Sequence, residues 1–393
     1  MPYRQERIRV SKFTQFTWFT KFARLTQFSR FALLKLNELS KLCKLCKLFL
    51  LFSMMLSLLF AVGVEAKMKG RCKDCHSMHA GTPFPVLTKG GCVGCHGQVP
   101  DGTQNIITMG KVRIPQILHH MGDGDLASGN FYYVADGYSP DYFKGHNVLG
   151  ISHQESIPTM NVPPGFIGNV VIPGGKGPVY WPPEQQLTCS GTWGCHGNRT
   201  IEDPYLSLYR AHHTHNSEND GSTTGRSYRF LYGITGVEHQ NWEYDATKDN
   251  HNGYKGDISH NTLDTISYLC GECHGKFHPN PNLGGLREVG STNSNIWKRH
   301  PADIAFSNIH GDFAGSEFMG YTIYSLESPV AYFNPTGKEQ VVDANSILMC
   351  LSCHRAHASP NPDALRWNYE NITTNDPTRE GCLICHTNKG RQQ

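Results

Sequence analysis

Five Cys-x-x-Cys-His motifs constrain this 393-residue chain more than any other feature. They are Cys72/Cys75/His76, Cys92/Cys95/His96, Cys270/Cys273/His274, Cys350/Cys353/His354 and Cys382/Cys385/His386. Two thiols at this spacing can each add to one vinyl group of the same porphyrin, and the adjacent histidine then lies under the iron as its proximal ligand. One Cys-x-x-Cys alone would equally fit a zinc half-site or a redox dithiol, but five copies that each continue into His indicate c-type haem. The sequence therefore predicts five covalently bound haems.

A sixth candidate site lies in the stretch CSGTWGCHG, where five residues instead of two separate Cys189 from Cys195. Three interpretations remain open: an expanded haem site with His196 as proximal ligand, a structural disulfide, or free thiols. An oxidising compartment disfavours free thiols. The Cys-His-Gly ending repeats that of two ordinary motifs, and Gly191 and Gly194 would let the longer loop bulge while both thiols stay at one porphyrin edge. The sequence thus favours a sixth haem over the disulfide.

The composition predicts a chain that is mostly irregular loop, with short helices and few short strands wrapped around a row of covalently bound haems. Hydrophobic residues make up 38% of the sequence, beside 40 Gly and 22 Pro, so porphyrins are expected to supply much of the apolar core. Strand-like composition occurs at 131–134 and 321–324. Short helices are expected at several haem motifs, for instance over 346–356.

Residues 1–66 are predicted to be a signal peptide with an extended or misannotated N-terminus, and 67–393 a multihaem cytochrome c domain. Three lysines precede an apolar run over 48–64, and Val64-Glu65-Ala66 resembles a signal-peptidase site. A retained membrane anchor is the alternative, but the run is short for a spanning helix. Cys43 and Cys46 lack a following His and are not expected to hold haem. The domain would carry haem pairs at 72–96 and 350–386, with isolated sites at 189–196 and 270–274.

Net charge changes sign once the leader is set aside. Residues 1–66 hold 11 Lys+Arg and 3 Asp+Glu, which leaves 36 − 11 = 25 basic and 33 − 3 = 30 acidic residues in 67–393. Nothing in this balance indicates nucleic-acid binding. Contact with a membrane is expected only through the signal segment.

Whether the sixth coordination position of each haem iron is filled or open distinguishes an electron carrier from an enzyme. Histidines outnumber the proximal positions, since the sequence has 21, whereas methionine, the competing axial ligand, is scarce after the leader. Bis-histidine ligation is therefore expected at most haems. A His three or four residues beyond a proximal His points away from its own iron and can reach a neighbouring haem. Those candidates are His79, His278 and His357, and weaker ones are His120, His146, His212, His213 and His300.

Several stretches resemble the outer-surface multihaem cytochromes of metal-reducing bacteria, and most of all the hexahaem, filament-forming kind often called cytochrome nanowires. They are the run CHRAHAS that begins at Cys353, the CHSMH that begins at Cys75, and the segments 144–147 and 299–302. The resemblance implies closely stacked bis-histidine haems that move electrons outside the cell, with one subunit lending a distal His to a haem of the next. It makes His79, His146, His300 and His357 better ligand candidates. The expanded third motif departs from the family pattern.

These features predict a secreted electron carrier without substrate chemistry, located at the cell surface or in the periplasm. Its expected partners are other cytochromes, redox proteins or further copies of itself. The alternative is a multihaem reductase of a small nitrogen or sulfur oxyanion with one open-coordinate haem. That enzyme's usual Cys-x-x-Cys-Lys site is absent from residues 67–393, and the surplus of His also disfavours an open iron.

Overall fold

The computed structural model describes the chain from Arg71 to Thr387, with gaps. The described residues are 71–78, 83–98, 102–110, 112–120, 124–138, 140–154, 162–166, 181–182, 184–209, 211–212, 230–280, 300–306, 320–373 and 380–387. The chain divides into two units, Met1–Val64 and Glu65–Gln393, and the described residues all belong to the second. Within them, no helix has the length and apolar character needed to cross a membrane.

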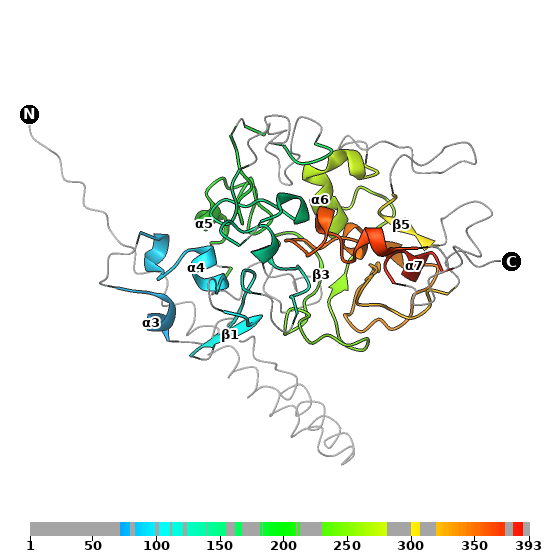
Figure 1. Ribbon diagram of the computed structural model, residues 1–393, viewed down its shortest axis with the longest axis horizontal. Helices are drawn as coiled ribbons and strands as arrows, with labels where there is room; N and C mark the ends of the chain where they lie inside the picture. Colours follow the sequence, from blue (N-terminus) through cyan, green and yellow to red (C-terminus); the bar gives the residue numbers. More distant parts are fainter. Residues whose placement is uncertain are drawn as a thin grey trace, which may run out of the picture. The chain divides into compact units, whose positions relative to one another are not determined.

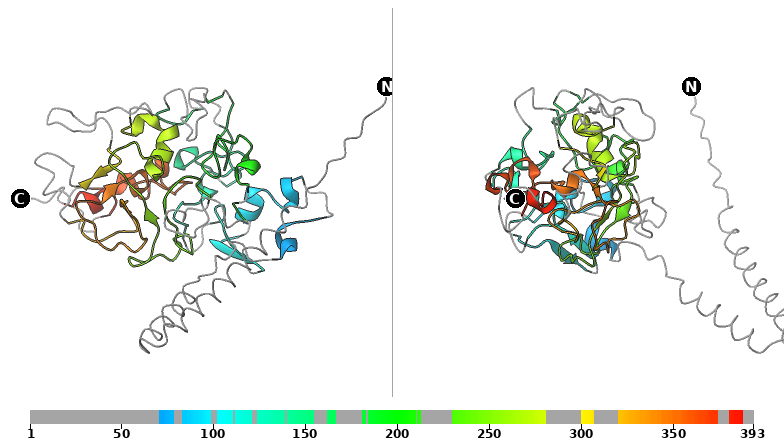
Figure 2. Two further views of the ribbon diagram at one scale, coloured as in Figure 1. Left: turned by 180° about the vertical axis from the view of Figure 1, so that it is seen from behind. Right: turned by 90° about the vertical axis from the view of Figure 1, so that its right-hand side faces the viewer.

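Short helices and very short strands joined by long loops make up the described unit (Figures 1 and 2). The α-helices are α3 (Cys72–Cys75), α4 (Cys92–His96), α5 (Pro204–Ser207), α6 (Ile266–Cys273) and α7 (Cys382–Cys385). The 3₁₀ turns are η2 (Pro85–Leu87), η3 (Phe131–Tyr133), η4 (Tyr142–Lys144), η7 (Gly275–Phe277), η10 (Cys350–Ser352), η11 (Pro362–Ala364) and η12 (Tyr369–Asn371). The predicted fold class is therefore confirmed, and four of the five α-helices carry a Cys-x-x-Cys-His motif.

Three antiparallel pairs of strands are the sheet structure of the described part of the chain. Strands β1 (Ile106–Met109) and β2 (Val112–Pro115) pair from Ile106↔Pro115 to Met109↔Val112. Gly110 opens the two-residue turn between them with φ +65°, a conformation that favours glycine. The two other pairs are β3 (Gly236–Val237) with β4 (Gly253–Tyr254), and β5 (Ile304–Ala305) with β6 (Ile347–Leu348).

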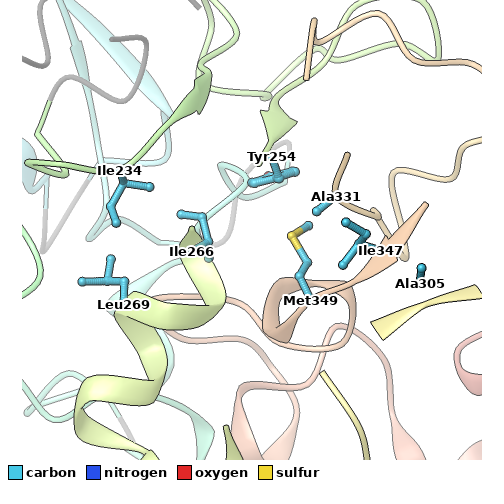
Figure 3. Close-up of a cluster of buried hydrophobic side chains, with 8 residues drawn as sticks. All are labelled: Ile234, Tyr254, Ile266, Leu269, Ala305, Ala331, Ile347 and Met349. Atoms are coloured by element: carbon cyan, nitrogen blue, oxygen red, sulfur yellow. The ribbon is translucent and has the colours of Figure 1, made fainter. Parts of the chain in front are cut away.

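The hydrophobic core of the described residues consists of small separate clusters, and a residue of a haem motif packs against each cluster. Figure 3 shows the largest, in which α6 packs beside the segment that leads into η10; it consists of Ile234, Tyr254, Ile266, Leu269, Ala305, Ala331, Ile347 and Met349. Cys270 and Leu351 pack against this cluster. Val93 and Cys189 pack against a second one, Ile384 and Cys385 against a third, and Cys273 against the cluster of buried Trp193. Core packing and the positions of the motifs are therefore coupled throughout the unit.

Three local predictions were wrong. Residues 131–133 form the 3₁₀ turn η3, because the Asn130 side chain accepts a hydrogen bond from the Tyr132 N–H and caps a turn. At 321–324 only Ile323 takes part in sheet-like pairing, through a single bridge to Val341. The stretch 346–356 contains strand β6 and turn η10 instead of one helix. Each segment is aromatic or apolar, and its local composition did not reveal which partner it would meet.

Candidate functional site

A shared backbone hydrogen bond defines the local form of the ordinary motifs. The proximal histidine N–H donates to the carbonyl of the first cysteine: His76 to Cys72 (2.8 Å), His274 to Cys270 (2.9 Å), His354 to Cys350 (3.1 Å) and His386 to Cys382 (2.9 Å). This closes one turn and places both thiols and the imidazole around the same point. In α6 the turn is prepared upstream, where the Thr265 hydroxyl accepts a hydrogen bond from the Tyr268 N–H (3.1 Å).

The expanded third motif closes in the same way. The His196 N–H donates to the Cys189 carbonyl at 3.0 Å, although seven residues instead of four separate the two. The extra length folds inward through a bond from the Gly194 N–H to the Gly191 carbonyl (3.0 Å). Gly191 has φ +86°, and a Cβ on Gly194 would meet the Ser190 nitrogen at 2.5 Å, so both turns depend on glycine. The expanded loop thus closes through the same backbone hydrogen bond as the ordinary motifs.

No disulfide joins Cys189 to Cys195 in the structure. The Cys189 side chain instead lies beside that of Cys92 in the second motif. Cys189 therefore lies next to the second motif.

Six candidate ligand histidines point Nδ1 at a backbone carbonyl oxygen. The contacts are His76 to Val86 (2.9 Å), His96 to Pro115 (2.9 Å), His146 to Ala356 (2.7 Å), His274 to Pro164 (2.8 Å), His300 to Pro301 (3.1 Å) and His354 to Asp363 (2.8 Å). A carbonyl oxygen only accepts, so Nδ1 carries the proton and the lone pair lies on Nε2, the form of imidazole that binds a metal. The same second contact orients the ring toward its metal.

Three histidine pairs lie at the spacing of two axial ligands on one iron. Their ring centres are 6.0 Å apart for His146 and His274, 6.2 Å for His196 and His357, and 6.1 Å for His300 and His386. Two imidazoles that each bind a metal at about 2 Å have ring centres roughly 6 Å apart. Each pair joins a proximal histidine to a distal candidate, so these residues fit a bis-histidine haem.

Electrostatics keep five of the paired rings neutral, as iron ligation requires. Burial, and then the neighbouring His146, lower the pKa of His274 to about 4. Burial and His96 do the same for His196, and burial with His196 lowers the pKa of His357 to about 3. Burial is also the main cause of the lowered pKa values of His146 and His300. All five are therefore unprotonated near pH 7.

The other candidates have different surroundings. Buried His278 contacts Asp303 Oδ2 through Nε2 (2.9 Å), while its Nδ1 accepts a hydrogen bond from the Asn280 N–H (3.1 Å), so both nitrogens are engaged. His120 packs between the rings of Tyr132 and Tyr138, and His212 lies 5.1 Å from Phe230. His79 and His213 lie outside the described residues. Within those residues, neither His96 nor His354 has a ring contact with a second histidine.

Neighbouring motifs approach one another in the order of the sequence. After burial, the Cys75 thiol is the next cause that raises the pKa of Cys95, which links the first and second motifs. Thiol hydrogen bonds link Cys92 to Cys189 and Cys270 to Cys350. The remaining neighbours are Cys195 with Cys273, and Cys353 with Cys385. Motifs that follow one another in the sequence therefore also lie next to one another in the structure.

The sequence did not single out the carbonyls that orient the rings, because any residue can supply one. It also did not indicate the partnership of Arg199 with Glu272, a buried ion pair between the third and fourth motifs. The available signal was Glu272 itself, a charged residue between the two cysteines of a motif expected to be buried against porphyrin.

Comparison with known proteins gives one match to a family model. Residues 342–391 match the doubled CXXCH motif, which covers the last two attachment sites. This match supports the prediction that the chain is a multihaem c-type cytochrome. No curated protein matches the chain.

Two solved structures are similar to the cytochrome. The outer membrane cytochrome S filament from Geobacter sulfurreducens is 18% identical, with a TM-score of 0.35, and the OmcS nanowires from the same organism are 17% identical, with a TM-score of 0.36. Each comparison covers 77% of this chain and 85% of the other.

Proposed function

We propose that this cytochrome carries electrons along a row of six c haems, most of them with two histidine ligands, outside the cytoplasm. The observation that carries the proposal is the set of three histidine pairs at the spacing of axial ligands. When bound, each haem supplies a one-electron couple, and the protein sets spacing, ligation and burial. No residue of the chain is assigned a catalytic role.

The thiol contacts between consecutive motifs support a continuous row. Thioether sulfurs mark porphyrin edges, so neighbouring sulfurs imply neighbouring macrocycles. The third site is the necessary middle member, because Cys189 lies beside the second motif and Cys195 beside the fourth. His357 extends from the fifth motif to His196 of the third, which ties separate parts of the row together.

The surroundings of His354 support association of the cytochrome with further copies of itself. Its ring is exposed, its Nδ1 is held by the Asp363 carbonyl, and no second histidine ring contacts it among the described residues. A histidine from another copy would complete this ligand pair, in line with the family resemblance of the sequence. A cell-surface or extracellular location and redox-protein partners belong to the same proposal.

The test is the intact mass of the secreted protein under non-reducing conditions, combined with its visible and electron paramagnetic resonance spectra. We expect six haems, all low-spin, and sedimentation as large polymers. Five haems would contradict the continuous row. A stable fraction of high-spin iron that binds nitrite or sulfite would instead support the reductase alternative, and monomers with six low-spin haems would contradict the polymer.

A further inference from the structure

A buried ion pair connects the third and fourth haem sites. Arg199 follows proximal His196 by three residues, and Glu272 lies between the two cysteines of the fourth motif. Their side chains form a direct ion pair, with 7% of the Arg199 side chain exposed and none of that of Glu272. Burying two charges is costly unless they stay paired, so this arrangement requires both partners.

The surroundings show that the pair lies at the joint between the two sites. Buried Trp193, one of the extra residues of the expanded loop, packs with Cys273 of the fourth motif and lies edge-on to Trp181 at 5.2 Å. The Thr192 hydroxyl donates to the Arg199 carbonyl (2.9 Å). Burial lowers the pKa of Arg199, while the Cys195 and Cys273 thiols act in the opposite direction, so the guanidinium lies near a sulfur of each motif.

We propose that Arg199 and Glu272 form a charge-neutral clamp, in which each charge cancels the effect that the other would have on the reduction potentials of the third and fourth haems. The inference rests on the proposed function and adds two positioning residues to it. A haem gains one negative charge when its ferric iron takes up one electron. An unpaired Arg199 would favour the reduced state, and an unpaired Glu272 the oxidised state. Because the joint is buried, solvent ions screen these effects little.

Spectropotentiometric titration of the full-length secreted holoprotein tests the clamp. We expect Glu272→Gln to raise the midpoint potential of two haems, seen as two haems' share of the total absorbance change. Arg199→Gln should lower the midpoint potential of the same two haems. The double variant Arg199→Gln/Glu272→Gln should return close to the wild-type curve. Lys248→Gln and Asp249→Asn are matched controls, because that pair is 61% and 55% exposed, and they should leave the curve unchanged.

If the midpoint potential shifts in the same direction in both single variants, the clamp is overturned. Such a result would mean that each substitution loosens the packing and exposes the haems to the same extent. Unchanged potentials would also overturn it. If one single variant does not fold, the other still has to shift with the sign of the remaining charge, and the double variant has to remove that shift. Intact mass separates the two levels: a wild-type protein without haem at the third or fourth site contradicts the proposed function, whereas six haems with same-direction shifts contradict only the clamp.

Discussion

The third and fourth attachment motifs differ by three residues in length, yet they close through the same hydrogen bond. His196 donates to Cys189 at 3.0 Å, and His274 donates to Cys270 at 2.9 Å. The fourth motif achieves this by ending a regular helix, α6, whereas the third uses two glycine-dependent turns. The comparison teaches that the closure from histidine to first cysteine, more than the number of intervening residues, describes the local form of these sites.

Removing both thiols should have the largest effect and should affect the two motifs alike. We expect Cys189→Ala/Cys195→Ala and Cys270→Ala/Cys273→Ala each to lower the intact mass by one haem, because no thioether bond remains. The equivalence fails if only the fourth-motif variant loses a haem. In that case the wild-type mass should rise by two hydrogens on reduction, as expected for a disulfide between Cys189 and Cys195.

Loss of the distal histidine should come next. His357→Ala is expected to convert one haem's share of the spectrum from low-spin to high-spin, and His146→Ala should do the same, because each leaves its iron with one imidazole. The control is His153→Ala, since His153 is largely exposed and pairs with Asp136. A fully low-spin His357→Ala variant would show that the third iron takes its ligand from elsewhere.

Substitution of glycine should have opposite effects in a motif that closes through turns and in a motif that closes as a helix. Gly191→Ala is expected to destabilise the fold by about 1–3 kcal/mol and to lower haem occupancy at the third site, because φ is +86° and the new Cβ would lie 2.6 Å from the Glu202 carbonyl oxygen. The matched substitution Gly94→Ala falls in helix α4, where nothing lies within 4 Å of the new Cβ. It should stabilise by about 0.5–1 kcal/mol. Denaturant midpoints and intact mass measure both effects.

The smallest expected effect is a pH dependence of the free energy of unfolding, to which the third and fourth sites contribute in the same direction. His196 and His274 have pKa values of about 4, well below the usual 6.5, so the unfolded chain binds more protons than the folded one between these values. The free energy of unfolding should therefore fall as pH decreases from about 6.5 toward 4. Denaturant titrations at pH 7.5, 6 and 5 check the direction of this change, since these values lie on both sides of the ordinary histidine pKa of about 6.5. A constant or rising stability on acidification would contradict it.

Much of the fold class followed from composition, since a Gly- and Pro-rich chain with few hydrophobic residues has little capacity for extended sheets or long helices. Individual elements were harder to predict. The aromatic run 131–134 has strand-like residues but becomes a turn, because the Asn130 cap and the surrounding cluster of Leu118 and Val148 decide its conformation. The distal candidates show the same limit: His278 and His357 both follow a proximal histidine closely, yet His357 meets the ring of proximal His196, whereas His278 contacts Asp303 and Asn280.

The sequence alone determined the covalent chemistry of this cytochrome, because cysteine spacing and the adjacent histidine are local properties of a few residues. Tertiary structure decided which histidine faces which: His146 reaches His274, and His300 reaches His386, across long stretches of chain. It also decided that Arg199 meets Glu272 at the joint between two sites. Such pairings depend on how separate segments pack around one another, and no local spacing rule encodes them.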